Sequence, residues 1–270
     1  MSKPPTHAQR WIEREARWTP ERQRCNTRSL EAAIIEDDAT AKAFVTTHHY
    51  SGSYPAARLR VGLYEHGELV GVAVFSEPPN VHTVTSWTGR PREEGVELGR
   101  FVLLDRVGYN AESWFWARAR RLLREHKPDV RVILAYSDPV ERRALDGKTT
   151  LPGHVGTIYQ ATNGAYLGRA RSKTLLLDPS GQVVSARALS KIRNQDRGKE
   201  YASAMLEDAT HTSQRPGETP REWVARAQRE LRKLAHPGNH VYAWGVTRRD
   251  NVPRSKPYPR QHDAQQTSLF

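Results

Sequence analysis

The pattern of apolar and polar positions predicts a mixed α/β core over residues 29–178. Its first part combines a helix that begins at acidic, cap-competent residues with two β-rich runs joined by a turn at His66-Gly67, which is typical of a β-hairpin. The predicted elements of this part are a strand at 29–35, a helix at 37–47 and hairpin strands at 58–65 and 68–75.

The second part of the core comes after a Pro-rich insertion at 77–95 and has the order of a βαβ crossover. A strand at 96–104, a long helix at 111–125 and an apolar strand at 130–136 make up the crossover. The two strands are therefore expected to be parallel within one sheet. The elements predicted after it are a short helix at 157–162 and strands at 165–169 and 173–178. The result is a mixed sheet flanked by helices.

The composition turns polar beyond residue 178, which marks the end of the core. Helices at 185–193 and 222–234, separated by a low-complexity stretch at 211–219, and a late strand at 241–246 are predicted there. The final residues are rich in Pro, Arg and Gln and are predicted to be disordered. The expected regions are an N-terminal arm at 1–28, the core at 29–178, an extension at 179–250 and a tail at 251–270.

Positive charge dominates the chain. It has 42 Lys and Arg against 30 Asp and Glu, a formal charge of +12 and a pI near 10.0. This excess creates a field that attracts polyanions, so nucleic acid is the first partner to consider. A generally basic proteome is the alternative, because charge determines neither the fold nor the reaction.

The N-terminal arm interleaves arginines with Trp11 and Trp18, a combination that can hold phosphates and stack on bases. A short amphipathic helix lying on the core is the alternative. The single cysteine, Cys25, excludes an internal disulfide, a Cys-rich zinc site and an iron–sulfur cluster, and it fits a reducing compartment. Neither a signal peptide nor an apolar run of roughly 18 residues is visible, so we expect a cytoplasmic protein with no membrane partner.

Polar segments interrupt the core at several places between residues 45 and 178. The clearest are His48-His49-Tyr50-Ser51-Gly52, Glu97-Leu98-Gly99-Arg100-Phe101, Tyr136-Ser137-Asp138-Pro139 and the run from Gly153 to Asn163. These segments resemble the phage Mom family of adenine-modification proteins. The order of the predicted elements is similar to that of the GNAT acyltransferase superfamily. A weaker likeness to related phage proteins lies at 236–242.

The resemblance implies a GNAT-like fold that attaches a small acetamido-type acyl group to the exocyclic N6 of adenine in double-stranded DNA, which protects phage DNA from restriction. It also implies a CoA-type donor, such as acetyl-CoA or another acyl-CoA, and an iron-type metal. Composition implies none of this.

A GNAT-like fold holds its donor where the strand at 96–104 separates from its neighbour, with backbone N–H groups of the next loop facing a pyrophosphate. The resemblance places donor contacts at Phe101, Val102, Leu103, Arg106, Gly108, Asn110 and Ala111. The loop departs from the superfamily pattern because its glycine stands one position early. An ordinary turn is therefore the alternative to a CoA-binding loop.

Asp138 comes directly after an apolar strand, so its carboxylate is expected at the carboxyl end of that strand, where open α/β sheets bind ligands. It can act as a base or a metal ligand, or it can tie the next loop. His49 and Tyr50 end the first helix, and an imidazole, a phenolate and the carboxylate of Asp138 suit iron or manganese. His48 takes the place of His49 if the register differs by one. A polar helix end is the alternative for both histidines.

Tyr159 and His154 are further candidates for acid–base chemistry. The Tyr159 hydroxyl can act as a general acid, and the imidazole of His154 titrates near neutrality. Either side chain can instead serve in packing or in a loop hydrogen bond. Enzymes that act on adenine N6 must extrude the base from the duplex, and Tyr54, Trp87 and Tyr159 are the aromatic residues expected to hold it.

Contacts with the phosphate backbone are expected from the extension. The residues concerned are Lys191, Arg193, Arg197, Arg232 and Lys233, together with His236 and His240. Such contacts do not depend on base sequence and weaken with salt.

Three functions fit these observations. The first is a Mom-like DNA adenine modifier. The second is a GNAT N-acyltransferase that uses acyl-CoA on another acceptor, such as tRNA, a protein amine or a small molecule, and it requires a complete CoA loop. The third is a DNA-binding protein with a degenerate core, in which neutral substitutions of Asp138 and Tyr159 leave function intact. The sequence does not determine the oligomeric state, and a fold alone does not settle chemistry.

Overall fold

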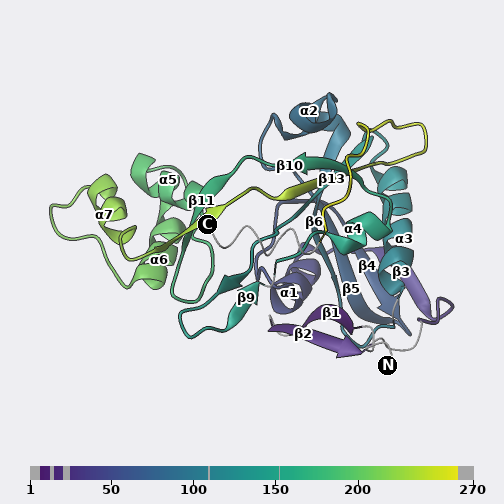
Figure 1. Ribbon diagram of the computed structural model, residues 1–270, viewed down its shortest axis with the longest axis horizontal. Helices are drawn as coiled ribbons and strands as arrows, with labels where there is room; N and C mark the ends of the chain where they lie inside the picture. Colours follow the sequence, from purple (N-terminus) through teal and green to yellow (C-terminus); the bar gives the residue numbers. More distant parts are fainter. Residues whose placement is uncertain (1–6, 13–14, 21–24, 109, 152, 261–270) are drawn as a thin grey trace. The chain divides into compact units, whose positions relative to one another are not determined.

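The protein is built on a seven-stranded mixed sheet (Figure 1). A computed structural model describes residues 7–12, 15–20, 25–108, 110–151 and 153–260. The strands, in spatial order, are β10 (Ala165–Arg169), β13 (His240–Gly245), β7 (Val132–Ser137), β6 (Gly95–Leu103), β5 (Glu68–Ser76), β4 (Ala57–Glu65) and β3 (Leu30–Ile34). Strands β6 and β7 are parallel, and the other neighbours are antiparallel. The mixed α/β class predicted from the sequence is therefore confirmed.

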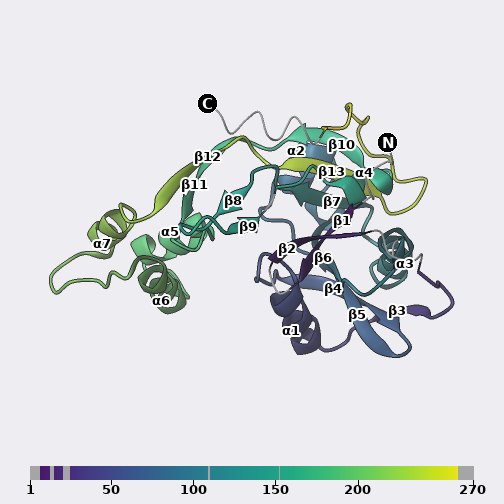
Figure 2. The same ribbon diagram turned by 60° about the horizontal axis from the view of Figure 1, so that its bottom comes forward.

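Helices cover both faces of this sheet, as Figure 2 shows for α1 (Asp38–His48) and α3 (Ala111–His126). Consecutive residues of a strand point to opposite faces. On β5, Val72 packs with α1, whereas the next residue, Ala73, packs with α3. Because both faces of β5 are covered, this strand reads as an almost continuous apolar run.

Shorter helices occupy the connections. In the Pro-rich insertion, α2 (Thr83–Thr88) buries Val84 against β7 and β13, and the single turn η1 (Arg92–Glu94) comes after it. The helix α4 (Thr157–Ala161) lies between β7 and β10 in the chain. No helix in the described part of the chain is both long and apolar enough to cross a membrane.

The parallel pairing of β6 and β7 is short. It joins Gly95, Val96 and Glu97 to residues 132–134 and then stops, although both strands continue. Beyond Glu97, β6 stays paired with β5, and β7 stays paired with β13. The register of β5 with β6 also shifts at Gly99, which marks a bulge. The two strands thus separate from Glu97 onward.

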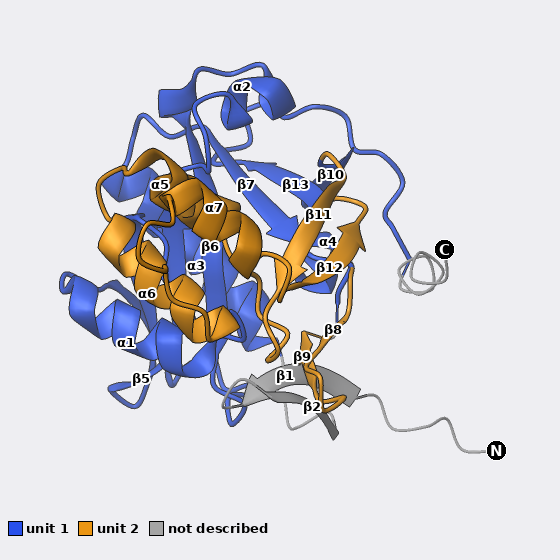
Figure 3. Ribbon diagram, turned by 90° about the vertical axis from the view of Figure 1, so that its left-hand side faces the viewer, with its two compact units in different colours: residues 1–139, 153–170, 239–270 blue, residues 140–152, 171–238 orange. Residues whose placement is uncertain are grey.

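The chain divides into two compact units (Figure 3). Unit 1 comprises residues 1–139, 153–170 and 239–270 and contains the seven-stranded sheet, and unit 2 comprises residues 140–152 and 171–238. The elements of unit 2 are β8 (Arg142–Arg143), β9 (Thr149–Leu151), β11 (Lys173–Leu177), α5 (Ala186–Asn194), α6 (Lys199–Thr210), α7 (Pro220–Ala227) and β12 (Arg232–His236). This division differs from the predicted one because residues 239–250 belong to the unit of the core, whereas residues 140–152 and 171–178 do not.

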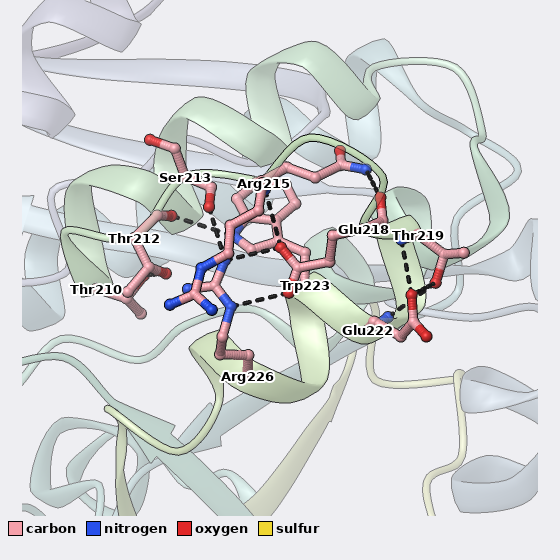
Figure 4. Close-up of polar contacts among 10 residues, drawn as sticks. Thr210, Thr212, Ser213, Arg215, Glu218, Thr219, Glu222, Trp223 and Arg226 are labelled. Atoms are coloured by element: carbon pink, nitrogen blue, oxygen red, sulfur yellow. Dashed lines mark hydrogen bonds and ion pairs between the residues drawn. The ribbon is translucent and has the colours of Figure 1, made fainter.

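The helices of unit 2 enclose their own apolar core, which includes Leu189, Leu206 and Trp223. The loop at 211–219, a low-complexity stretch in the sequence, is fixed by side chains of α7 (Figure 4). The Arg226 guanidinium donates to the Glu218 carboxylate at 2.8 Å, and the Trp223 indole donates to the Thr212 carbonyl at 3.1 Å.

Two expectations, one about a helix and one about the sheet, are wrong. The predicted helix at 222–234 ends at Ala227, and residues 232–236 form β12, which pairs with β11 along its whole length. Strand β11 therefore pairs outside the central sheet. In the arm, residues 7–12 (β1, His7–Ile12) and 15–20 (β2, Glu15–Pro20) are antiparallel strands, which contradicts the amphipathic helix considered as an alternative.

The tail is ordered at residues 251–260, where disorder was expected. The Ser255 hydroxyl accepts a hydrogen bond from the backbone N–H of Tyr166, and the Lys256 N–H donates to the Tyr166 carbonyl. These contacts give the backbone of β10 partners on the side away from β13. Residues 261–270 lie outside the described residues.

Candidate functional site

The polar segments of the sequence meet in unit 1, where β6 and β7 separate. Arg100 on β6 donates from Nε to the Ser53 carbonyl at 2.8 Å and from Nη2 to the Ser53 hydroxyl at 2.7 Å, which ties β6 to the loop after α1. The His154 N–H donates to the Asp138 carbonyl at 2.7 Å, which ties the run at 153–163 to the end of β7. The rings of Tyr50 and His154 are 6.4 Å apart, so the loop after α1 also contacts the run at 153–163.

Glu97 occupies the last parallel pair before the two strands separate. Its side chain is half-buried, and no described residue hydrogen-bonds to its carboxylate or forms an ion pair with it. Burial raises the pKa of Glu97 to about 7, although the Arg100 guanidinium favours the ionised form. Glu97 can therefore gain or lose a proton at neutral pH.

Arg100 is the cation of the site. Burial lowers the pKa of its guanidinium, and Tyr50, Glu97 and Tyr159 oppose this shift. The bulge at Gly99 re-aims the residues of β6 at this point. A Cβ at Gly99 would lie 2.4 Å from the Ser76 hydroxyl oxygen, so glycine is required where β6 passes β5.

Tyr159 projects from α4 into a group of aromatic rings. Its ring lies 5.4 Å from that of Tyr242, 5.6 Å from Trp244 and 6.5 Å from His154. Burial raises the pKa of the Tyr159 hydroxyl, and Tyr50 and Glu97 raise it further. The hydroxyl therefore holds its proton at neutral pH and is available as an acid.

His154 and His49 are both neutral at pH 7. Burial lowers the pKa of His154, although the Asp138 carboxylate opposes the shift. Burial, Arg100 and His154 together lower the pKa of His49 to about 3. Asp138 thus lies beside His154 at the end of β7, in agreement with its predicted place at the carboxyl end of that strand.

The geometry at His49 does not favour a metal ligand. Its Nδ1 accepts the Ser51 N–H at 3.2 Å and lies 2.9 Å from the Ser51 hydroxyl. The ring proton of the neutral imidazole is then on Nε2, which leaves no lone pair there for a metal. Within the described ranges, no group of three or more His, Cys, Asp and Glu side chains is placed to hold a metal ion. The set His49, Tyr50 and Asp138 stays a prediction.

The donor residues expected from the sequence fall into two groups. Phe101 stacks on Phe115 at 5.4 Å, and Val102 and Leu103 are buried, so these residues pack the core. Arg106 forms ion pairs with Glu68 at 2.7 Å and Glu65 at 3.6 Å. Asn110, with a φ of 69°, precedes Ala111 at the start of α3 and makes no side-chain cap, and Gly108 lies in the same loop. What this loop offers a donor is therefore mainly its backbone.

The aromatic residues expected to hold a base differ in position. Trp87 and Tyr136 pack against the same cluster of buried residues. Burial and the charge of Glu97 raise the pKa of the Tyr136 hydroxyl, so Trp87 belongs to the surroundings of the site. The Tyr54 hydroxyl donates to Asp38 at 2.9 Å, at the beginning of α1.

The residues expected to contact phosphates lie in unit 2, except His240, which lies in unit 1. Lys191 and Arg193 are on α5, and Arg232 and Lys233 are on β12. Two further candidates, His236 and His240, are only 2% and 1% exposed, and His240 Nδ1 lies 2.9 Å from the Tyr166 hydroxyl. The expectation that these two histidines grip phosphates is therefore wrong.

Glu97 and Arg100 are the site residues to which the sequence alone assigned no role. Both stand in the polar segment at 97–101, and the available signal was a charged pair within an otherwise apolar strand. Their importance depends on the separation of β6 from β7, which a strand pattern does not show.

The chain is similar to one protein family and to several solved structures. The model of the Mom protein family matches residues 30–219. No curated protein matches the chain.

Among solved structures, a tandem GNAT protein from the clavulanic acid biosynthesis pathway has a TM-score of 0.42 and 12% identity, and the match covers 82% of this chain and 100% of that one. An N-acetyltransferase from Staphylococcus aureus Mu50 has a TM-score of 0.35 and 8% identity, with 80% and 97% coverage. A putative acetyltransferase from Pyrococcus horikoshii has a TM-score of 0.37 and 9% identity, with 88% and 98% coverage.

Proposed function

Because the chain belongs to the Mom protein family, we propose that it transfers a small acyl-type group to the exocyclic N6 of adenine in double-stranded DNA. Membership of this family suggests a transferase. Adenine as the acceptor rests on what the resemblance to the family implies. The structural observation that supports the proposal is Glu97, a carboxylate that titrates near pH 7 beside Arg100 and Tyr159.

The amino group of adenine is a weak nucleophile because its lone pair is delocalised into the ring. Ionised Glu97 accepts a proton from N6 while the bond between N6 and the acyl carbon forms. The Arg100 guanidinium stabilises the negative charge that develops on the acyl oxygen. Tyr159 gives its proton to the leaving group as the bond between the acyl carbon and that group breaks. The proton on Glu97 then returns through solvent to Tyr159.

An acyl-CoA such as acetyl-CoA would supply an activated carbonyl carbon for this reaction. The separation of β6 from β7 and the backbone of the loop before α3 fit such a donor. The Arg106 side chain fits it less well because two carboxylates already bind it. His154 lies beside Tyr50, and Asp138 lies beside His154. These two residues are the remaining candidates for moving protons. Iron or manganese stays a prediction on which no step here depends.

Binding to DNA would combine two sets of residues. We assign the stacking of an extruded adenine to Trp87, Tyr54 and Tyr159. The phosphate contacts are assigned to Lys191, Arg193, Arg232 and Lys233. Protection of phage DNA from restriction would result from a modified adenine.

The test is nucleoside mass spectrometry of plasmid DNA from cells that express the protein. The wild type should give a deoxyadenosine of increased mass, and this product should be lost in Glu97→Gln and Asp138→Ala. Glu93→Gln is the matched control because Glu93 is exposed. Unmodified DNA together with consumption of an acyl thioester by the purified protein would favour another acceptor. Wild-type DNA binding with neither activity would favour a DNA-binding protein without catalysis.

A further inference from the structure

Residues 251–260 continue past β10 to the helix that carries Tyr159. After the contacts of Ser255 and Lys256 with Tyr166, the Tyr258 hydroxyl donates to the Gly164 carbonyl at 2.9 Å. The Pro259 carbonyl then accepts from Gln160 Nε2 at 3.2 Å. Gln160 belongs to α4, and Gly164 lies a few residues beyond it. The segment thus holds the end of α4 and the turn after it.

The helix α4 depends on contacts from outside itself. It has only 5 residues, begins at Gly156 with a φ of 79° and makes no side-chain N-cap. A helix this short is unstable in isolation. Its position is set by Gln160 Nε2, which also donates to the Val155 carbonyl and the Tyr242 hydroxyl, and by the Trp244 indole, which donates to the Thr162 carbonyl.

The contacts of Tyr258 extend to Tyr159, which we propose as the acid. The Tyr258 ring lies 6.3 Å from the Tyr242 ring, which lies 5.4 Å from Tyr159. A Cβ at Gly164 would be 2.9 Å from the Tyr159 carbonyl oxygen, so the turn held by Tyr258 is packed directly on the residue that we propose as the acid.

We propose that residues 255–259 are a strap that positions Tyr159, with Tyr258 and Gln160 as positioning residues. The functional part of this inference rests on the proposed function of the site. The strap does more than cover the edge of β10, because Tyr258 and Pro259 contact the turn and helix beyond that strand.

Hydrogen exchange tests the structural part without any substrate. Tyr258→Phe removes one hydroxyl from a side chain that is 41% exposed, so the chain should still fold. Amides at 157–164 should exchange about three- to tenfold faster, the range expected for the loss of one net hydrogen bond. Amides of α3 should be unchanged. The matched control is Tyr201→Phe, since Tyr201 is 78% exposed on α6 in unit 2.

Kinetics on DNA test the functional part. Tyr258→Phe should lower kcat for adenine modification about tenfold with little change in KM for DNA, because misplacement of a catalytic group acts on the chemical step. Gln160→Ala should behave in the same way, and Tyr201→Phe should match the wild type.

The two parts fail in different ways. Unchanged exchange at 157–164 in both Tyr258→Phe and Tyr258→Ala would overturn the strap, whatever the activity. Faster exchange with an unchanged kcat would overturn its positioning role. If the wild type modifies no DNA, the proposed function fails, and the exchange result still decides whether the strap exists.

Discussion

Glu97 is costly for the fold. Partial burial removes part of the hydration of its carboxylate, and no described residue provides a hydrogen bond in return. Arg100 recovers part of this loss, but it is itself held by Ser53, and its own burial lowers its pKa. Such an arrangement is typical of a functional position, where stability is given up for a group that titrates near the working pH.

Substituting Glu97 should therefore separate stability from activity. The pKa of Glu97 is about 7 in the folded protein and 4.5 in the reference state, so the native state binds more protons between these values. Stability consequently falls as pH rises from about 4.5 to about 7, and the penalty remains above that range. Glu97→Gln should raise Tm at pH 8, leave it almost unchanged at pH 4 and abolish adenine modification. An equal change of Tm at both pH values would contradict this assignment, and Glu93→Gln is the control.

Gly99 should tolerate no side chain while Ser76 keeps its hydroxyl. Gly99→Ala places a Cβ 2.4 Å from the Ser76 oxygen and 3.0 Å from Pro55. Either the bulge or Ser76 must then shift, and we expect a loss of about 1–3 kcal/mol in the free energy of unfolding, as for other overpacked positions. Ser76→Ala in the same chain should restore part of the loss, as measured by a double-mutant cycle in urea. A strictly additive cycle would rule out the steric explanation.

At the scale of elements, the helices and strands predicted correctly from the sequence are those whose apolar periodicity comes from packing in or on the central sheet. The hairpin of β4 and β5 and the crossover from β6 through α3 to β7 lie within one or two residues of their predicted bounds. The wrong predictions concern segments whose structure depends on the strand with which they pair. Residues 232–236 are polar and adjoin a helix, yet they form a strand because β11 offers a complete partner.

In the candidate site, too, local sequence patterns identified some residues, and only the tertiary structure identified the others. His49, Tyr50, Asp138, His154 and Tyr159 lie in unit 1 on segments that resemble the family, and sequence motifs identified them. The roles of Glu97 and Arg100 could not be predicted because burial and strand separation give them their properties. The ordered part of the tail was missed for a similar reason. Its residues are polar and Pro-rich, and only the free edge of β10 and the turn after α4 give them partners.

The loop at 211–219 allows a prediction for unit 2. Hydrogen bonds from Arg226 and from the Arg215 backbone lower the pKa of Glu218 to about 2 (Figure 4). A lowered carboxylate pKa stabilises the fold above its unfolded value of 4.5, and this contribution is lost as pH falls toward 2. Arg226→Ala should speed hydrogen exchange at 211–227 at pH 7, with a smaller effect at pH 3. The control is Arg221→Ala, since Arg221 is exposed on α7. Equal effects of both substitutions would contradict a specific role of the pair.

At the scale of the whole molecule, the net charge of +12 should make the affinity for DNA fall as the salt concentration rises. Each cation that neutralises a phosphate contributes about 0.9 to the slope of log K against log salt. Lys191→Ala and Lys233→Ala should each lower this slope by about 1 without preference for a base sequence, since phosphate contacts carry no sequence information. Fluorescence anisotropy over a series of salt concentrations measures the slope, and Lys42→Ala, an exposed position on α1, is the control.

Kinetic measurements would show whether the lysines of unit 2 contribute only to DNA binding and not to the chemical step. Saturating DNA should restore the wild-type kcat to Lys191→Ala and Lys233→Ala, because neither residue belongs to the site at β6 and β7. Glu97→Gln should show the opposite behaviour, with an unchanged slope and no product. If Lys42→Ala lowered the slope as much as the two substitutions in unit 2, the attraction would come from the net charge of the molecule rather than from a defined DNA-binding surface.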